Sequence, residues 1–254
     1  MYLSNEKFVS DYLERIGYYG STAPTLQTLI DLQRCHLYAV PFENLELLKD
    51  GFEPALSRDY LYDKIVRQRR GGVCHELNTS FYYLLTAMGF DAHQIGGRSY
   101  LDKPMTGHAF TLIRLPEGDY TADVGYGDDA VPPLNLTTRE AVEDYFARFW
   151  IEDDEEGFQR MYLQRPDEEP AFQYQFSPKP MVTEDFIDTF RETATKGVTF
   201  FAEEYFCCRY YAEGKTLFLR GVLTVTKGNT VVERRTVATG EETEWVLRKY
   251  FDLP

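Results

Sequence analysis

The 254-residue sequence holds 27 basic and 41 acidic residues, a formal net charge of −14, with 43% hydrophobic and 15% aromatic residues. The aromatic content excludes a disordered chain, and the acidity argues against a nucleic acid partner, which calls for a basic surface. No apolar run approaches the roughly 18 residues of a membrane span, and charges at Glu6, Lys7 and Asp11 exclude a signal peptide. We therefore expect a folded cytoplasmic protein with no membrane partner and with four reduced cysteines.

The first 90 residues are predicted to be helical. Apolar residues recur at three- and four-residue spacing in four segments, which stop at glycine or before proline. Ser4 or Asn5 is the expected N-cap of the first segment, and Ser57 that of the third. The predicted helices span residues 4–17, 25–40, 57–70 and 74–89.

Strand patterns begin after residue 90. Residues 108–115 and 120–127 flank the turn sequence PEGD and predict a β-hairpin. Helices followed by strands and a mixed end predict an α+β fold with two or three subdomains. Further strands are expected in 147–165 with a turn at Glu156–Gly157, in 171–176 and in 205–237, and helices in 183–196 and 241–251.

Cys74 lies at the predicted start of the fourth helix, behind the sequence RRGGV. Unpaired backbone N–H groups and the helix dipole favour a thiolate there, as would Arg69 or Arg70 nearby. Gly71 and Gly72 would permit a tight approach to the sulfur. The segment alone is equally typical of a reactive thiol and of a buried helical cysteine.

The four histidines are the candidate bases for such a thiol. His75 is adjacent to Cys74, so on a helix it should point about 100° away from the sulfur. Core or surface packing explains His36, and His93 has only Asp91 as an acidic neighbour. With no C-x-x-C and no H-x-x-x-H pattern, we expect no metal site.

His108 and Asp123 can share one face of the predicted hairpin. If the turn is centred on Glu117–Gly118, Asp123 lies opposite Leu112, with His108 four residues further along that face. This register leaves a gap, so contact between His108 and Asp123 requires a bulge or a different pairing.

Five short motifs, in this order along the chain, resemble those of the bacterial-type arylamine N-acetyltransferases. Within them, Cys74, His108 and Asp123 match the catalytic triad of that family. The motifs are PFENL at 41–45, RRGGVCHELN at 69–78, GHAFTLI at 107–113, DVGYG at 123–127 and FSPKP at 176–180.

The resemblance implies an N-terminal helical bundle, a central antiparallel β-barrel-like domain and a C-terminal α/β lid, with a papain-like cysteine-enzyme catalytic core. The expected boundaries are residues 1–90, 91–180 and 181–254. It also implies a ping-pong reaction, in which acetyl-CoA acetylates the cysteine and an arylamine, arylhydrazine or N-hydroxyarylamine then takes the acetyl group. No cofactor is bound permanently, and the protein is expected to be a monomer or weak homo-oligomer.

By the same resemblance, Cys74 is the nucleophile, His108 its base and Asp123 the carboxylate that orients the imidazole. Arg70 and Glu43 match a pair that braces the active-site helix. The resemblance further assigns Phe42, Val73 and Tyr126 to the acceptor pocket, and Thr106, Gly107, Gly125 and Gly127 to CoA binding.

The sequence departs from the family pattern beside the cysteine, where Val73 precedes it and His75 follows it. These residues bear on the shape of the acceptor pocket. Three alternatives stay open: a related acyltransferase or amide synthase that uses another thioester, a cysteine peptidase, and a catalytically silent binding homologue.

Overall fold

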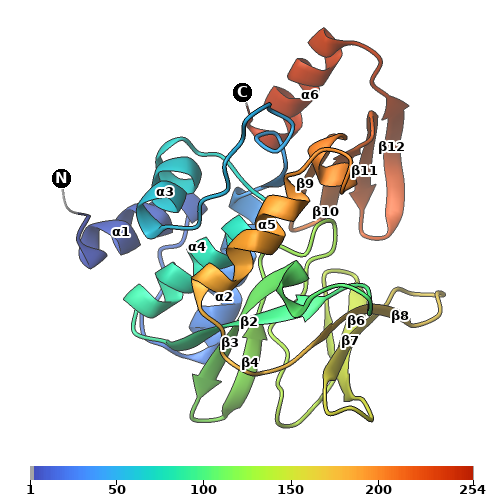
Figure 1. The fold of residues 1–254 in the computed structure, drawn as a ribbon. Coiled ribbons are helices and arrows are strands. Elements are labelled where there is room, and N and C mark those ends of the chain that lie inside the picture. Colours follow the sequence, from blue (N-terminus) through green and yellow to red (C-terminus); the bar gives the residue numbers. More distant parts are fainter. Residues whose placement is uncertain (1–2, 254) are drawn as a thin grey trace.

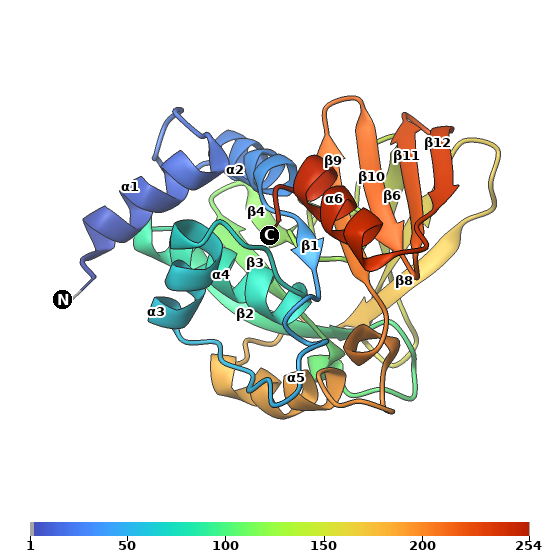
Figure 2. The same cartoon turned by 90° about the horizontal axis from the view of Figure 1, so that it is seen from above.

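A computed structural model describes residues 3–253 of the chain. Helices occupy the N-terminal part, as the apolar spacing predicts, and they gather on one side of the molecule (Figures 1 and 2). They are α1 (Asn5–Ile16), α2 (Leu26–Ala39), α3 (Arg58–Leu61), a π-helical segment (Tyr62–Arg67) and α4 (Cys74–Ala87).

The helix starts follow the predicted caps. The side chain of Ser4 accepts a hydrogen bond from the Lys7 N–H, and Ser57 does the same for Tyr60. The third helix differs from its prediction, because regular α-helix ends at Leu61 and a wider π turn continues the segment. That wider turn contains Lys64, whose ammonium group is buried in ion pairs rather than exposed.

A seven-stranded antiparallel sheet, in the order β4-β3-β2-β8-β7-β6-β5, follows α4 in the chain. The hairpin, the strand pair around Glu156–Gly157 and the strand at 171–176 are confirmed, whereas β2 and β5 were not predicted. The strands are β2 (Asp91–Arg98), β3 (His108–Leu115), β4 (Gly118–Ala122), β5 (Val142–Asp144), β6 (Ala147–Asp153), β7 (Gln159–Gln164) and β8 (Ala171–Phe176), with a 3-10 turn at Met105–Gly107.

The segment between the two sheets is helical, as predicted for 183–196, and consists of a 3-10 turn (Thr183–Phe186) and α5 (Ile187–Thr193). A second 3-10 turn follows at Phe200–Ala202. The sheet of the C-terminal part has five strands in the order β1-β9-β10-β11-β12. They are β1 (Phe42–Glu43), β9 (Phe206–Tyr211), β10 (Gly214–Leu219), β11 (Val222–Lys227) and β12 (Thr230–Thr236).

Helix α6 (Gly240–Phe251) lies over the five-stranded sheet (Figure 2). Strand β9 alternates its side chains between two cores, as adjacent strand residues must. Cys207 faces the core under α6, while Cys208 faces the core of the N-terminal helices. The short strand β1 pairs with β9 and so brings the segment before the cysteine motif against the C-terminal sheet.

The architecture as a whole is mixed α and β, which confirms the expected combination of N-terminal helices with antiparallel sheets. Helix α4 packs against β2 and β3 (Figure 1). Between residues 3 and 253, no helix has the length and apolar character needed to cross a membrane.

Candidate active site

Cys74 is the first residue of α4, as predicted. The residue before it, Val73, is extended, and its N–H donates to the Glu76 carboxylate at 3.2 Å. That buried carboxylate in turn forms an ion pair with Lys64 at 2.6 Å. The start of the helix is therefore held by a buried charge pair, which fixes the direction in which the thiol points.

The two glycines before Val73 are required by packing. A Cβ at Gly71 would lie 1.9 Å from the Pro41 carbonyl oxygen, and one at Gly72 would lie 2.6 Å from Oε2 of Glu76. The explanation from sequence, access to the sulfur, is therefore not the main one. The close approach of the Pro41 backbone at Gly71 and of the buried Glu76 side chain at Gly72 leaves no room for a side chain at either position.

The predicted pair of Arg70 and Glu43 is confirmed, with Nη2 and Oε1 2.8 Å apart and both side chains buried. The Glu43 carboxylate also accepts a hydrogen bond from the Leu45 N–H at 2.8 Å. Arg70 is engaged with Glu43, and the groups that lower the pKa of Cys74 are His75 and His108. The charges that reach the sulfur come from histidine.

His108 and Asp123 are in contact, with Nε2 of the ring 2.7 Å from Oδ2 of the carboxylate. Both side chains are buried. The other oxygen of Asp123 accepts hydrogen bonds from the side-chain amide of Asn78 at 2.9 Å and from the Gly125 N–H at 3.0 Å. Since a carboxylate only accepts, Nε2 of His108 carries a proton, and the rest of the ring is left to face the thiol.

The hairpin register that allows this contact differs from the predicted one. Leu115 pairs with Gly118, so the turn consists of Pro116 and Glu117 alone. Continued past the Thr111–Ala122 pair, this register brings Asp123 beside Phe110, two residues from His108. The expected position opposite Leu112 is wrong, and no bulge is needed, because the tighter turn shifts the returning strand by two residues.

His75 also reaches the sulfur, contrary to the expectation from helix geometry. Its Nδ1 lies 3.5 Å from the Cys74 Sγ, while Nε2 lies 2.9 Å from the Thr106 carbonyl oxygen. The ring is stacked on Phe190 at a centroid distance of 5.2 Å. The 100° rotation separates the Cα–Cβ bonds only, and the contacts with Thr106 and Phe190 turn the ring back alongside the thiol.

The electrostatics of the site favour a thiolate. Burial raises the pKa of Cys74, but the charge on His75 and the hydrogen bond with His108 outweigh burial and lower that pKa to about 5. Burial lowers the pKa of His108, but the charge of Asp123 and its hydrogen bond outweigh burial and raise that pKa to about 10. Near neutral pH the group is a thiolate, an imidazolium and a carboxylate in a row.

The three other cysteines lack this environment. Burial raises the pKa of Cys35, that of Cys207 by a large amount and that of Cys208 to about 12. All four cysteines, each within the described residues 3–253, are free thiols.

The residues predicted for the acceptor pocket come from different elements of the fold. Phe42 packs on Phe206 at a centroid distance of 4.9 Å and is mostly buried. Val73 is buried directly before the cysteine. The Tyr126 ring stands edge-on to His108 at 5.1 Å, and its hydroxyl donates to the Gln173 carbonyl oxygen at 2.8 Å.

The residues predicted for CoA binding lie on the 3-10 turn before β3 and on the loop after β4. Thr106 presents its carbonyl oxygen to His75, and a Cβ at Gly107 would meet nothing closer than 3.7 Å. Gly125 packs against the start of α4, where a Cβ would lie 3.0 Å from the Cys74 Cα. Gly127 has a φ of +60°, in the left-handed region that favours glycine.

Three site residues were missed by the sequence reasoning. Asn78 donates to Asp123 and accepts the Val124 N–H at 2.8 Å, so it ties α4 to the loop after β4. Gln33 accepts the Asp123 N–H at 3.2 Å, and Tyr174 places its hydroxyl 3.4 Å from Oδ2. Asn78 stands in the cysteine motif, four residues after Cys74 on the same helix face, which was a usable signal. Gln33 and Tyr174 lie outside the recognised motifs, so the sequence gives no signal of their role.

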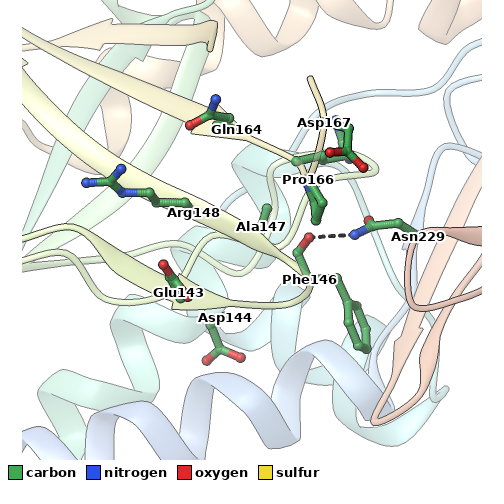
Figure 3. Close-up of a pocket in the computed structure, with 10 residues that line it drawn as sticks. Glu143, Asp144, Phe146, Ala147, Arg148, Gln164, Pro166, Asp167 and Asn229 are labelled. Carbon is green, nitrogen blue, oxygen red and sulfur yellow. Dashed lines mark hydrogen bonds between the residues drawn. The ribbon is translucent and has the colours of Figure 1, made fainter. Parts of the chain in front are cut away.

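A separate pocket of about 630 Å³ lies between the β5–β6 hairpin, the residues after β7 and the β11–β12 turn (Figure 3). In Figure 3 the side chain of Asn229 reaches across to the Phe146 carbonyl oxygen, to which it donates at 2.8 Å. The lining residues include Arg148 and Asp167 but none of Cys74, His108 and Asp123. The pocket is therefore distinct from the thiol site.

A cysteine thiolate at a helix start, beside a buried histidine–carboxylate pair, defines a class of enzymes that transfer acyl groups through a cysteine thioester. A family model described as N-acetyltransferase matches residues 25–254. The chain belongs to the arylamine N-acetyltransferase family. It is an acyltransferase of that family, with acetyl-CoA as its cosubstrate.

Individual relatives cover nearly the whole chain. The chain is 31% identical to the proansamycin X synthase of Amycolatopsis mediterranei, covering 92% of this chain and 93% of that protein. It is 30% identical to human arylamine N-acetyltransferase 1, covering 96% of this chain and 93% of that protein.

Solved structures agree as well. The arylamine N-acetyltransferase of Salmonella typhimurium superposes with a TM-score of 0.90 at 26% identity, covering 97% of this chain and 91% of that one. The Mycobacterium marinum enzyme in complex with CoA superposes with a TM-score of 0.87 at 25% identity, covering 96% of this chain and 92% of that one.

Proposed function

We propose that Cys74 is the nucleophile, His108 the general base and Asp123 the orienting carboxylate of a ping-pong acetyl transfer from acetyl-CoA to small aromatic amines or hydrazines. The observation that carries the proposal is the buried 2.7 Å contact between His108 and Asp123, beside a thiol whose pKa is about 5. A thiolate is the reactive form of cysteine, and the carboxylate both fixes the tautomer of the ring and stabilises its charge.

In the first half-reaction the Cys74 thiolate attacks the carbonyl carbon of acetyl-CoA. The bond to the CoA sulfur breaks, and His108 gives its proton to that sulfur. The attacking and leaving groups are both sulfur anions, so the exchange is nearly balanced. In the second half-reaction the nitrogen of the arylamine or arylhydrazine, or the hydroxylamine group of an N-hydroxyarylamine, attacks the thioester carbon and its proton passes to His108. The bond between that carbon and Sγ breaks, the Cys74 thiolate leaves beside the protonated His108, and the stable product drives the step forward.

Phe42, Val73 and Tyr126 are proposed to shape the acceptor pocket. The edge-on contact of Tyr126 with His108 supports this for one wall, since an aromatic acceptor beside the thioester would meet that ring. The burial of Val73 beside the thiol and the stacking of Phe42 support a rigid, apolar surround.

Thr106, Gly107, Gly125 and Gly127 are proposed to line the path of CoA. The absence of a side chain at Gly107 and the left-handed turn at Gly127 support close backbone approach by a ligand. The N–H of Gly125 is already donated to Asp123, so this residue would contribute shape rather than a hydrogen bond to phosphate.

We also propose the expected division at residues 1–90, 91–180 and 181–254, with a β-barrel-like middle domain, an α/β lid and a papain-like core. The packing of the cysteine-bearing helix α4 against the histidine-bearing strand β3 supports such a core. A cytoplasmic location and a monomeric or weakly associating state are part of the same proposal, and the four free thiols support the location.

A second candidate is a related acyltransferase or amide synthase that uses another thioester. The 31% identity to a protein named as a synthase favours keeping this candidate. The two candidates share the thiol chemistry and differ in the acyl group, so the rates of acylation by acetyl-CoA and by longer acyl thioesters distinguish them.

The proposal is tested by incubation with acetyl-CoA and no acceptor, followed by intact-mass and peptide-mass analysis. One acetyl group should be added to Cys74, Cys74→Ser should abolish the addition, and the matched variant Cys35→Ser should retain it. Release of free CoA against a panel of arylamines and hydrazines then identifies the acceptor. Acetylation at Cys35, Cys207 or Cys208 instead would refute the assignment of the nucleophile.

A further inference from the structure

The Cys74 sulfur has two imidazole neighbours, and only one of them is used in the reaction above. His75 is fully buried, with Nδ1 3.5 Å from Sγ. Its ring cannot turn away freely, because Nε2 is hydrogen-bonded to Thr106 and one face is stacked on Phe190. The orientation of this second ring toward the sulfur is therefore fixed by its surroundings.

The partner of Nε2 decides where the protons of His75 are. The Thr106 carbonyl oxygen can only accept, so Nε2 carries hydrogen whatever the charge of the ring. Nδ1 then faces the sulfur either as a bare lone pair or as an N–H. A lone pair facing a thiolate is repelled, whereas an N–H donates to it.

The charged groups around His75 are compatible with a protonated Nδ1, the state in which the ring donates to the thiolate. The Cys74 thiolate and His108 are the ionisable groups that act on the ring, and the thiolate raises the pKa of His75 against the opposing effects of burial and of His108. On α5, which packs over the ring, Asp188 and Arg191 pair with each other in solvent. On the preceding 3-10 turn, Glu184 and Asp185 are exposed as well.

In the first turn of α4, which carries Cys74 and His75, the one acidic side chain is Glu76, and it is paired with Lys64. Two negative groups, Cys74 and Asp123, thus face two rings that can carry positive charge.

We propose that His75 is a second catalytic imidazole, which donates a hydrogen bond from Nδ1 to the Cys74 thiolate and shares with His108 the stabilisation of negative charge on that sulfur. The inference rests on the proposed role of Cys74 as nucleophile. The thiol proton passes to His108, and the proton on Nδ1 of His75 comes from solvent.

The second ring matters most when the sulfur is a leaving group. In acetyl transfer to the amine, the bond between the acetyl carbon and Sγ breaks, and negative charge returns to Cys74. A thiol of lower pKa leaves faster but attacks more slowly. His75 therefore favours the second half-reaction over the first, which suits an enzyme whose acceptor is a weakly basic aromatic amine.

The test is the pH dependence of Cys74 alkylation by iodoacetamide, read by peptide mass between pH 4 and pH 9.5. The proteins are wild type, His75→Gln, His75→Phe, His108→Gln and the double variant His75→Gln/His108→Gln. His93→Gln, on the far end of β2, is the matched control for loss of a histidine. Circular dichroism establishes that each variant is folded.

Wild type and His93→Gln should show a transition near pH 5. Each single variant at His75 or His108 should move it upward by about one pH unit or more, tenfold in thiolate, and only the double variant should reach about pH 8.5. In single-turnover assays, His75→Gln should slow transfer to the amine more than acetylation of the enzyme.

An unshifted profile in both His75 variants would overturn the inference, as would a return to about pH 8.5 in His108→Gln alone. Equal slowing of both half-reactions would assign His75 a structural role only.

If the His75 variants do not fold, nitrogen-15 NMR of the wild-type protein decides: Nδ1 of His75 should be protonated at pH 7 and lose that proton in Cys74→Ser. Labelling at another cysteine would instead refute the proposed nucleophile, which separates the two failures.

Discussion

His36 is a buried histidine outside the thiol site, and it should make the fold sensitive to mild acid. It lies in α2, fully buried, with its ring stacked near Tyr12 at a centroid distance of 5.9 Å and tilted against Phe81 at 5.4 Å. Neither ring nitrogen has a hydrogen-bond partner within the described part of the chain. Burial, with a smaller effect of the nearby Arg15, lowers its pKa from 6.5 to about 3.

The sign and size of the effect follow from that shift. Between pH 6.5 and pH 3 the unfolded chain binds the proton and the folded chain does not, so the free energy of unfolding falls as the pH falls. With these two values the loss is close to zero at pH 7.5 and about 2 kcal/mol at pH 5. A leucine at this position has a similar volume and cannot titrate, so His36→Leu should remove that loss.

Urea unfolding of wild type and His36→Leu at pH 7.5, 6.0 and 5.0, followed by circular dichroism, measures the effect. Other groups titrate in the same range, but their contributions cancel in the difference between the two proteins. This difference should move by about 2 kcal/mol in favour of the variant between pH 7.5 and pH 5. A difference that stays constant with pH would refute the reasoning.

Three further predictions concern the thiol site and its support. Lys64→Met leaves the Glu76 carboxylate buried without its cation and should lower the free energy of unfolding by about 3–5 kcal/mol; a loss under about 1 kcal/mol in urea unfolding would contradict this. Gly125→Ala adds a Cβ 3.0 Å from the Cys74 Cα, so we expect slower acetylation of a protein that remains folded. An unchanged rate in stopped-flow assays would contradict this and show that the loop after β4 moves to accommodate the methyl group. Asp123→Asn should slow acetylation by up to about 10⁴-fold with the fold retained, and near-normal turnover would remove Asp123 from the triad.

Much of the fold could be predicted because local signals agree with it. Ser4 and Ser57 cap helices where their side chains can bind free N–H groups, and the turn at Glu156–Gly157 separates two strands. Strand β2 was missed because it carries Gly96 and Gly97, which weaken a strand pattern. The structure gives one reason for the first of them: a Cβ at Gly96 would lie 2.3 Å from the Met105 carbonyl oxygen.

The site was predictable in its residues and less so in its geometry. The position of Cys74 at a helix start follows from the sequence, whereas the contact of His108 with Asp123 depends on whether the hairpin turn has two residues or more. The buried partners of Lys64 are not apparent from sequence, because ion pairs form across elements that only the folded chain brings together. The approach of His75 to the sulfur depends on Thr106 and Phe190, which lie far from it along the chain.

The pairing of β1 with β9 has a consequence for how the enzyme is made. Phe42 and Glu43 pair with Cys208 and Cys207 as well as with Gly72, and Asn44 binds backbone groups of Phe201, Glu204 and Phe206. A ribosome releases the partners at 201–208 after about four-fifths of the chain has been synthesised. The segment that braces the loop before Cys74, through the ion pair of Glu43 with Arg70, is therefore completed on its other side only by residues near the end of the chain.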